Sequence, residues 1–334
     1  MAQSTFPMPV STAPMEARLA DDIPSEKGAW QYEPKWDGFR CLAFKGSGIV
    51  DIRAKSGKPL GRYFPELVDR LRRLSARQFV IDGEIVIEQS GGYSFDALQM
   101  RLHPAESRIR KLSAETPAEL VLFDMLADSN GEVLTGHPLS LRRAALEEFV
   151  KSSGINDIEL SPMTLDPGEA ETWLRGAGTG RTDGVVAKRR DAPYLSGERA
   201  MVKVKRMRTA DCVIGGFRYL ADRREAGSLL LGLYDAEGKL DHVGFTSTIG
   251  NDERPALTRR LERLREPPGF TGKAPGGPSR WSTDRTGAWE PVRPELVVEV
   301  RFDHITGDRF RHGTKFLRWR PDKEPRQCTF DQLR

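Results

Sequence analysis

One lysine near the start of the chain, Lys35, lies in a sequence suited to nucleophilic chemistry. A lysine amine attacks an electrophile only in its neutral form, which desolvation beside Trp36 and Phe39 would favour. Asp37-Gly38 is typical of a turn in which glycine supplies a positive φ. Lys35 and Arg40 could then flank that turn and face one phosphate. The alternative is a half-exposed strand on which the lysine stem packs and its ammonium group reaches water.

Three acidic residues adjoin or interrupt apolar stretches further along the chain. Asp82 and Glu84 lie within residues 79–87, which we expect to form a buried pair of strands. Burying two carboxylates there is costly without a cation or strong donors, so both are functional candidates. An exposed hairpin turn would explain Asp82 better than Glu84. Asp183 precedes another apolar strand, residues 184–188.

Two further lysines alternate with valine in residues 201–205. In a strand, Lys203 and Lys205 would project from the same face while the valines point the other way. Two ammonium groups on one face repel each other unless they share an anion. A phosphate group would supply that anion.

The elements that must position these residues fall into two groups. Residues 1–27 indicate an arm with a short helix at 15–19. Hydrophobic periodicity then predicts strands at 30–36, 40–44, 49–54 and 120–126, and helices at 65–77, 94–102, 140–150 and 168–175. Beyond residue 206 the pattern predicts strands at 211–217, 229–235, 242–248, 295–302 and 315–319, a helix at 253–265 and a loop at 267–290. This second group fits a small oligonucleotide-binding barrel.

The composition limits the classes of protein to consider. A chain of 334 residues predicts two domains. No apolar run approaches the ~20 residues of a membrane span, and no secretory signal is evident, so we expect a cytoplasmic protein. Cys41, Cys212 and Cys328 are too dispersed to indicate zinc or disulfides. The net charge is only +4, but residues 181–208 hold nine basic and three acidic side chains, and residues 301–326 hold eight and four. Such segments indicate a polyanionic partner.

Six short motifs, together and in order, resemble those of the covalent nucleotidyltransferases and most closely those of the ATP-dependent DNA ligases. The resemblance spans residues 14–323. The motifs are Lys35-Trp36-Asp37-Gly38-Phe39-Arg40, Asp82-Gly83-Glu84, Phe123-Asp124, Asp183-Gly184-Val185-Val186-Ala187-Lys188, Lys203-Val204-Lys205 and Arg318-Trp319-Arg320-Pro321-Asp322-Lys323. Each motif alone is weak, but six at the proper spacing are not expected by chance. Within the family, the chain is similar to the bacterial ligase C type and to the ligase module of ligase D.

The resemblance implies an α+β fold in two domains. Residues 1–206 would form an adenylation (nucleotidyltransferase) domain with antiparallel sheets and flanking helices. Residues 207–334 would form an all-β oligonucleotide-binding barrel. The implied activity is the ATP-dependent sealing of 3′-hydroxyl/5′-phosphate nicks in duplex DNA through a lysyl-AMP intermediate. The resemblance further implies a role in DNA repair and a location in the cytoplasm, associated with the nucleoid.

The resemblance also assigns roles to individual residues. Lys35 would carry AMP, while Lys203, Lys205, Asp183 and Glu84 complete the catalytic set. Mg²⁺ or Mn²⁺ would be held by Glu84 and Asp183. The residues expected to bind ATP are Glu33, Pro34, Lys35, Arg40, Lys55, Glu84, Phe123, Lys203, Lys205, Arg318, Arg320, Asp322 and Lys323. Among them, Phe123 would stack on adenine and Glu33 or its backbone would read the exocyclic amine.

The sequence departs from the family pattern at two places. Asp183 stands where the family usually has glutamate, so the carboxylate is one methylene shorter. Ala54-Lys55 replaces the usual Ser-Arg, and a lysine makes a point contact where arginine offers a fork. Lys55, or Arg53 nearby, would take over the contact to the ribose or phosphate.

The expected partner is nicked double-stranded DNA, with a repair polymerase as a further candidate and the protein acting as a monomer. We expect the phosphates to be held by the two cationic segments and by Arg142, Arg143 and residues 188–190. The rival interpretations are an RNA ligase, a capping-type nucleotidyltransferase that uses GTP, and a non-catalytic DNA-end binding protein. The last would not need acids facing a polyanion.

Overall fold

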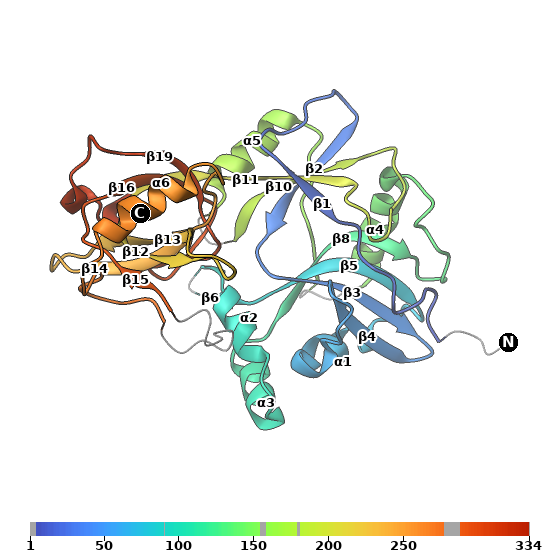
Figure 1. Cartoon of the computed structure of the whole chain (residues 1–334). Helices are drawn as coiled ribbons and strands as arrows, with labels where there is room; N and C mark the ends of the chain where they lie inside the picture. Colours follow the sequence, from blue (N-terminus) through green and yellow to red (C-terminus); the bar gives the residue numbers. More distant parts are fainter. Residues whose placement is uncertain (1–4, 90, 154–157, 179–180, 277–287, 334) are drawn as a thin grey trace. The chain divides into compact units, whose positions relative to one another are not determined.

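The computed structural model describes residues 5–89, 91–153, 158–178, 181–276 and 288–333. By their internal contacts the residues fall into two compact units, Met1–Arg206 and Met207–Arg334. Figure 1 shows both, coloured along the chain. None of the described helices is long and apolar enough to cross a membrane.

The first unit is built on two sheets. One has five strands in the order β4-β3-β5-β8-β9, antiparallel except for the last pair: Ile49–Ala54, Phe39–Gly46, Phe79–Val86, Glu119–Ala127 and Ile158–Leu160. The other has four strands in the order β1-β11-β10-β2: Ala17–Ala20, Met201–Lys205, Thr182–Arg189 and Trp30–Trp36. A small hairpin joins β6 (Glu88–Gln89) to β7 (Gly92–Tyr93).

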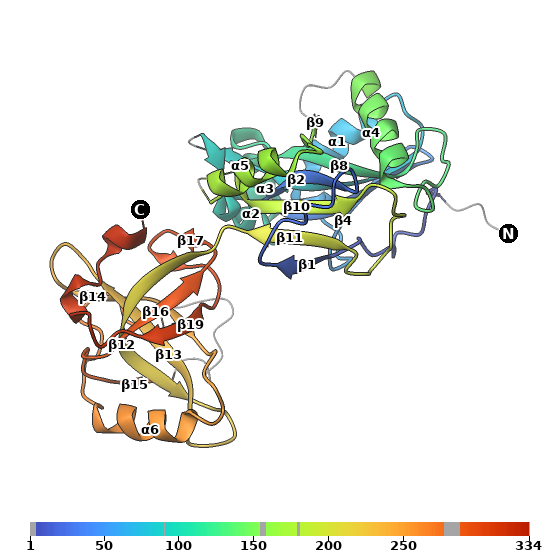
Figure 2. The ribbon, with the colours of Figure 1, turned by 90° about the horizontal axis from the view of Figure 1, so that it is seen from above.

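Helices cover the outer faces of these sheets. They are α1 (Pro65–Arg73), α2 (Phe95–Arg101), α3 (Glu106–Glu115), α4 (Leu139–Ser153) and α5 (Pro167–Gly176), with a 3-10 turn at η1 (Gly61–Tyr63). Leu67 and Leu71 of α1 are buried, as their helical spacing predicts. The α1 helix ends at Arg73, short of the predicted residue 77, because Leu74 adopts an extended ψ. Figure 2 shows α5 beside β2 and β10, which it contacts.

An apolar cluster joins the two sheets. Leu42 and Phe44 of the five-stranded sheet pack with Met201 of the four-stranded sheet and with Met8 and Met15 of the N-terminal segment. The two sheets therefore face each other, and residues from both can meet between them.

Two predictions about this unit are wrong. Residues 15–19 do not form a helix, because Ala17–Ala20 pairs in parallel with β11 and backbone pairing overrides the local preference. Residues 79–87 do not form a pair of strands, because β5 runs unbroken through Asp82-Gly83-Glu84. The hairpin alternative for Asp82 is excluded as well.

The second unit is a curved antiparallel sheet with one helix. The strand order is β14-β13-β12-β16-β19: Leu240–Thr246, Ala226–Tyr234, Arg208–Tyr219, Val297–Phe302 and Lys315–Trp319. The remaining elements are α6 (Arg254–Arg263), β15 (Glu290–Pro291), β17 (Ile305–Thr306), β18 (Arg309–Phe310), η2 (Pro325–Gln327) and η3 (Phe330–Leu333). One bridge, Thr246 to Thr314, links the two edges, so within the described residues the ladder is not a fully closed barrel. Part of the loop predicted at 267–290, residues 277–287, lies outside the described residues.

Candidate active site

A pocket in the first unit gathers side chains from both sheets. Its walls are Glu16, Ala17, Glu33, Pro34, Lys35, Trp36, Arg40, Lys55, Glu84, Phe123, Val186, Lys188, Met201 and Lys203. Every first-unit residue expected to bind ATP is among them except Lys205. Strands far apart in sequence therefore place the predicted residues around one cavity.

Lys35 meets its acidic partner across the four-stranded sheet. Gly184 of β10 lies opposite both Lys35 and Lys205, so the three form a row across three strands. The register shifts between Thr182 and Gly184, and Asp183 lies at this irregularity. Its carboxylate contacts both lysines, with Lys35 Nζ 2.8 Å from Oδ1 and Lys205 Nζ 3.4 Å from Oδ2. The bulge lets one buried acid serve two cations.

Glu84 reaches the same pocket from the five-stranded sheet. Its Oε1 accepts a hydrogen bond from the backbone N–H of Gly38 at 3.1 Å. Burial raises the pKa of Glu84 to about 8, although Lys35 and Arg40 oppose the shift.

Gly38 has a different role from the one predicted. Its φ is not positive, and β2 and β3 are not a hairpin, because they belong to different sheets. A Cβ at Gly38 would lie 2.3 Å from the backbone oxygen of Ile85. Glycine is therefore required because the chain passes close to β5 where it crosses from one sheet to the other.

Arg40 is held by the second acid of β5. Its Nε and Nη2 donate to Asp82 at 3.0 and 2.7 Å, and the Tyr194 hydroxyl donates to the same carboxylate at 2.6 Å. Burial alone would lower the pKa of Arg40, but Asp82 outweighs it and the pKa is raised. The buried Asp82 is thus fully partnered, and the guanidinium lies 5.4 Å from the centre of the Phe123 ring.

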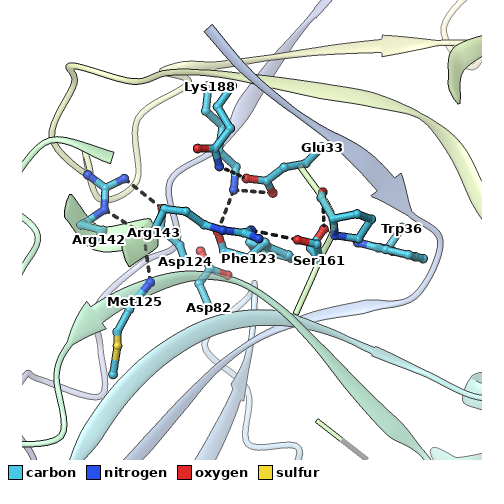
Figure 3. Close-up of polar contacts among 12 residues, drawn as sticks. Glu33, Trp36, Asp82, Phe123, Asp124, Met125, Arg142, Arg143, Ser161 and Lys188 are labelled. Carbon is cyan, nitrogen blue, oxygen red and sulfur yellow. Dashed lines mark hydrogen bonds and ion pairs between the residues drawn. The ribbon is translucent and has the colours of Figure 1, made fainter. Parts of the chain in front are cut away.

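A buried ion pair forms the wall beside Phe123 (Figure 3). Lys188 Nζ lies 2.8 Å from Glu33 Oε2, and each side chain is only 3% exposed. Gln31 donates to the other oxygen of Glu33 at 2.7 Å. Lys188 also donates to the Phe123 carbonyl at 3.1 Å and lies 4.7 Å from the centre of its ring.

The expectation that Arg142, Arg143 and Lys188 contact DNA is wrong, because all three are buried. Arg142 donates to both oxygens of Asp124, at 2.8 and 2.9 Å, and Arg143 donates to the Ser161 carbonyl at 2.8 Å (Figure 3). A cation whose donors face internal acceptors cannot reach a phosphate outside. The motif Phe123-Asp124 thus contributes a structural acid as well as a ring.

Two more lysines complete the pocket. Burial, followed by the charges of Lys35 and Lys205, lowers the pKa of Lys203. Lys55 lies 3.1 Å from Glu16, an acid that the sequence did not single out. No local pattern marks Glu16, since the pairing of β1 with β11 is what brings it to the pocket.

The remaining predicted residues belong to the second unit, where they form a cluster of their own. Arg318 pairs with Glu299 at 2.6 Å, and Arg320 pairs with Asp322 at 2.8 Å. Arg320 and Lys323 both contact Asp211.

The acids of the first unit fit a hard divalent cation. Oδ1 of Asp183 is buried and accepts no hydrogen bond from any described residue, although it forms the ion pair with Lys35. In the part of the chain that the structure describes, no group of three or more His, Cys, Asp or Glu side chains could hold a metal. Mg²⁺ characteristically takes one or two carboxylates together with substrate phosphates and water.

The fold and the site define the class of protein. The chain is similar to the ligase domain of M. tuberculosis LigD, with a TM-score of 0.52 and 29% identity over 96% of this chain and 98% of that one. It also shares its fold with a Lig E DNA ligase, at a TM-score of 0.57 and 17% identity over 91% and 99% of the two chains. The predicted two-part fold of a nucleotidyltransferase and an oligonucleotide-binding domain is confirmed.

The family models make the assignment specific. The ATP dependent DNA ligase domain matches residues 14–205, and the ATP dependent DNA ligase C terminal region matches residues 222–323. The chain belongs to the ATP-dependent DNA ligase family, as the motifs predicted. DNA ligase C1 of Mycolicibacterium smegmatis is 43% identical over 98% of this chain and 95% of its own length, and DNA ligase C of Mycobacterium tuberculosis is 41% identical over the same shares.

Proposed function

We propose that the protein seals nicks in duplex DNA in three phosphoryl transfers, with Lys35 as the nucleophile of the first. The Lys35 amine attacks the α-phosphate of ATP, forms a phosphoramidate with AMP and expels pyrophosphate. AMP then passes to the 5′-phosphate at a nick. The adjacent 3′-hydroxyl attacks that phosphate and releases AMP. The observation that carries this proposal is the position of Lys35, which contacts Asp183 and lines a pocket together with Glu84, Phe123 and Lys203.

The first transfer depends on charge neutralisation and positioning more than on proton transfer. Lys203 and Lys205 would neutralise the α-phosphate, and burial together with the nearby charges of Lys35 and Lys205 lowers the pKa of Lys203. Asp183 would hold Lys35 in place until the nucleotide arrives.

Recognition of the nucleotide would fall to the opposite wall of the pocket. Phe123 would stack on adenine, and Arg40 with Glu84 would contact the ribose. Both carboxylate oxygens of Glu33 already accept from internal donors, Gln31 and Lys188. Glu33 would therefore accept a hydrogen bond from the exocyclic amine of adenine through a remaining lone pair of the carboxylate or through its backbone carbonyl. Pro34 and Lys55, also in the wall, would contact the base and the phosphates respectively.

Glu84 and Asp183 would hold Mg²⁺ or Mn²⁺ at the phosphates. The ion would supply further neutralisation of the charge on the phosphates. Oδ1 of Asp183, which is buried and accepts no hydrogen bond from a described residue apart from its ion pair with Lys35, supports this assignment.

The C-terminal cluster would act on the leaving group. Arg318, Arg320, Asp322 and Lys323 would orient pyrophosphate when the second unit brings them to the nucleotide. The same unit would later bind DNA, with a hinge in residues 205–208.

The substrate would be a nicked duplex, held through its phosphates by the two cationic segments. We further propose that the protein acts in repair as a monomer in the cytoplasm, associated with the nucleoid and with a repair polymerase. The support for the repair role is the similarity to the LigD proteins, which are named for end joining and DNA repair.

The test is protein labelling with α-³²P-ATP. Lys35→Ala should abolish labelling, while Lys111→Ala, at a lysine on the exposed α3, should retain it. Sealing of a pre-adenylated nick should survive in Lys35→Ala, because that step does not need the amine. Labelling of the variant at another residue would refute the assignment, and equal labelling by GTP would favour a capping-type enzyme. Nicks with RNA on either side would separate DNA from RNA sealing.

A further inference from the structure

One carboxylate of the second unit holds two cations of the C-terminal motif. Arg320 Nη1 lies 2.8 Å from Oδ1 of Asp211, and Lys323 Nζ lies 2.6 Å from Oδ2. Asp211 is 10% exposed, while the two cations are 19% and 23% exposed. Such partly desolvated, charge-assisted contacts fix side-chain orientation more firmly than surface pairs do.

The backbone of Asp211 is fixed as well. Its N–H donates to Oε1 of Gln332 at 2.9 Å, and its carbonyl accepts from Nε2 of the same amide at 3.1 Å. Asp211 also pairs with Glu299 in the β12–β16 ladder. The carboxylate therefore has little freedom to move, so it can act as a fixed anchor.

The arrangement differs from that of the neighbouring acid. Glu299 lies directly opposite Asp211, and opposite Glu299 on β19 lies Arg318. Glu299 binds this one cation, whose side chain is 65% exposed. Two acids facing each other across strands repel, and the cations offset that repulsion. Of these two facing acids, Asp211 is the one that contacts two cations of the motif among the described residues, so it sets their separation.

The two cations keep donors for a ligand. Arg320 uses Nε and Nη2 on Asp322 and Nη1 on Asp211, which leaves two of the five guanidinium N–H groups without a partner among the described residues. Lys323 donates to Asp211, and two of its three N–H groups likewise have no described partner. A phosphate can thus bind both cations without displacing them from Asp211.

We propose that Asp211 is a positioning residue for the transfer of AMP from ATP, because it holds Arg320 and Lys323 at a fixed separation while both keep donors that pyrophosphate could use. The inference rests on the proposed role of the C-terminal motif. Long side chains that are already ordered lose less rotamer freedom when the ligand arrives. Asp211 touches neither nucleotide nor DNA in this role.

The test separates the three transfers in the full-length protein. Asp211→Asn should slow single-turnover AMP transfer from ATP to Lys35 on the order of tenfold. The reverse reaction, ATP formation from the AMP-bound enzyme and pyrophosphate, should slow by a similar factor. Sealing of a pre-adenylated nick should change less than about twofold, since pyrophosphate takes no part in it. Asp211→Glu should restore part of the loss. Glu237→Gln, which removes an exposed acid paired with Lys239 in the same unit, is the control and should leave AMP transfer unchanged.

The outcomes distinguish the proposed role of the C-terminal motif from the positioning role of Asp211. If Arg320→Ala and Lys323→Ala leave AMP transfer unchanged, the proposed role of the motif fails. If those variants slow AMP transfer and Asp211→Asn does not, the positioning role of Asp211 is overturned. Equal slowing of all three transfers would show that Asp211 serves the fold alone and would also overturn it. If Asp211→Asn does not fold, Gln332→Ala, which loosens the backbone at Asp211, takes its place. This variant should also slow AMP transfer while sealing of a pre-adenylated nick stays nearly unchanged. An unchanged rate of AMP transfer would refute the proposal.

Discussion

Removing one member of the buried pair between Glu33 and Lys188 should destabilise the protein more than removing both. The two charges lie 2.8 Å apart, and each side chain is 3% exposed. Lys188→Met leaves the carboxylate with the Gln31 amide but without its cation. Loss of one partner of a buried pair costs about 3–5 kcal/mol, because the other charge stays desolvated.

The double variant Glu33→Gln/Lys188→Met removes both charges. Its free energy of unfolding should therefore fall by less than the sum of the single losses, with a coupling of ~2 kcal/mol or more. The measurement is urea unfolding of the full-length chain, followed by tryptophan fluorescence, for the four members of the double-mutant cycle. The exposed pair between Glu106 and Arg110, at 2.6 Å on α3, is the control, and its coupling should stay below ~0.5 kcal/mol.

The functional consequence can be measured on the same variants. Lys188 lies over the Phe123 ring and binds the Phe123 carbonyl, so Lys188→Met should loosen the surface on which adenine would stack. The KM for ATP should rise more than kcat falls. In the unfolding experiment, a coupling energy between Glu33 and Lys188 as small as that of the exposed pair would mean that the single losses simply add. That result would refute the reasoning from burial.

Three further predictions concern other parts of the molecule. Burial lowers the pKa of His242 to about 3, so the unfolded chain binds a proton that the folded chain excludes, and the free energy of unfolding should fall by up to ~1.4 kcal/mol per pH unit as pH drops below about 6.5. His242→Gln should reduce this dependence of the unfolding free energy on pH, measured by urea unfolding at pH 7, 6 and 5. An equal pH dependence in both proteins would show that His242 is not its source. Gly38→Ala should slow AMP transfer and lower the melting temperature, because its Cβ would meet the Ile85 carbonyl, whereas Gly136→Ala has open space and should do neither. The apparent affinity for nicked duplex should fall steeply with added salt, and an affinity indifferent to salt would exclude binding through phosphates.

The sequence predicted much of the first unit because local rules govern much of it. The alternation of Lys203 and Lys205 with valine predicted a strand, and β11 carries both lysines. The predicted helix at 168–175 is α5, where the Asp166 side chain caps the first turn by accepting from the Gly168 N–H. These features depend on neighbours a few residues apart, so a single stretch of chain contains the information.

The sequence could not distinguish cations that face outward from those that are buried. Arg142 and Arg143 looked like any basic pair on a helix, yet they bind Asp124 and the Ser161 carbonyl inside the fold. Asp124 and Ser161 each lie 18 residues along the chain from the arginine they bind, and only the packed structure brings the partners together. The cationic character of a segment therefore overestimates its capacity to bind DNA.

By itself, the sequence determined the motifs, their order and the chemical character of the pocket, because residue types and short-range spacing are sufficient for these. Only the tertiary structure decided which acid meets which cation. Asp183 contacts Lys35 and Lys205 at the point where the register between β10 and β2 shifts, and Glu84 reaches the pocket of Lys35 from the other sheet. Register between distant strands is set by the packing of the whole core, and local sequence does not specify it.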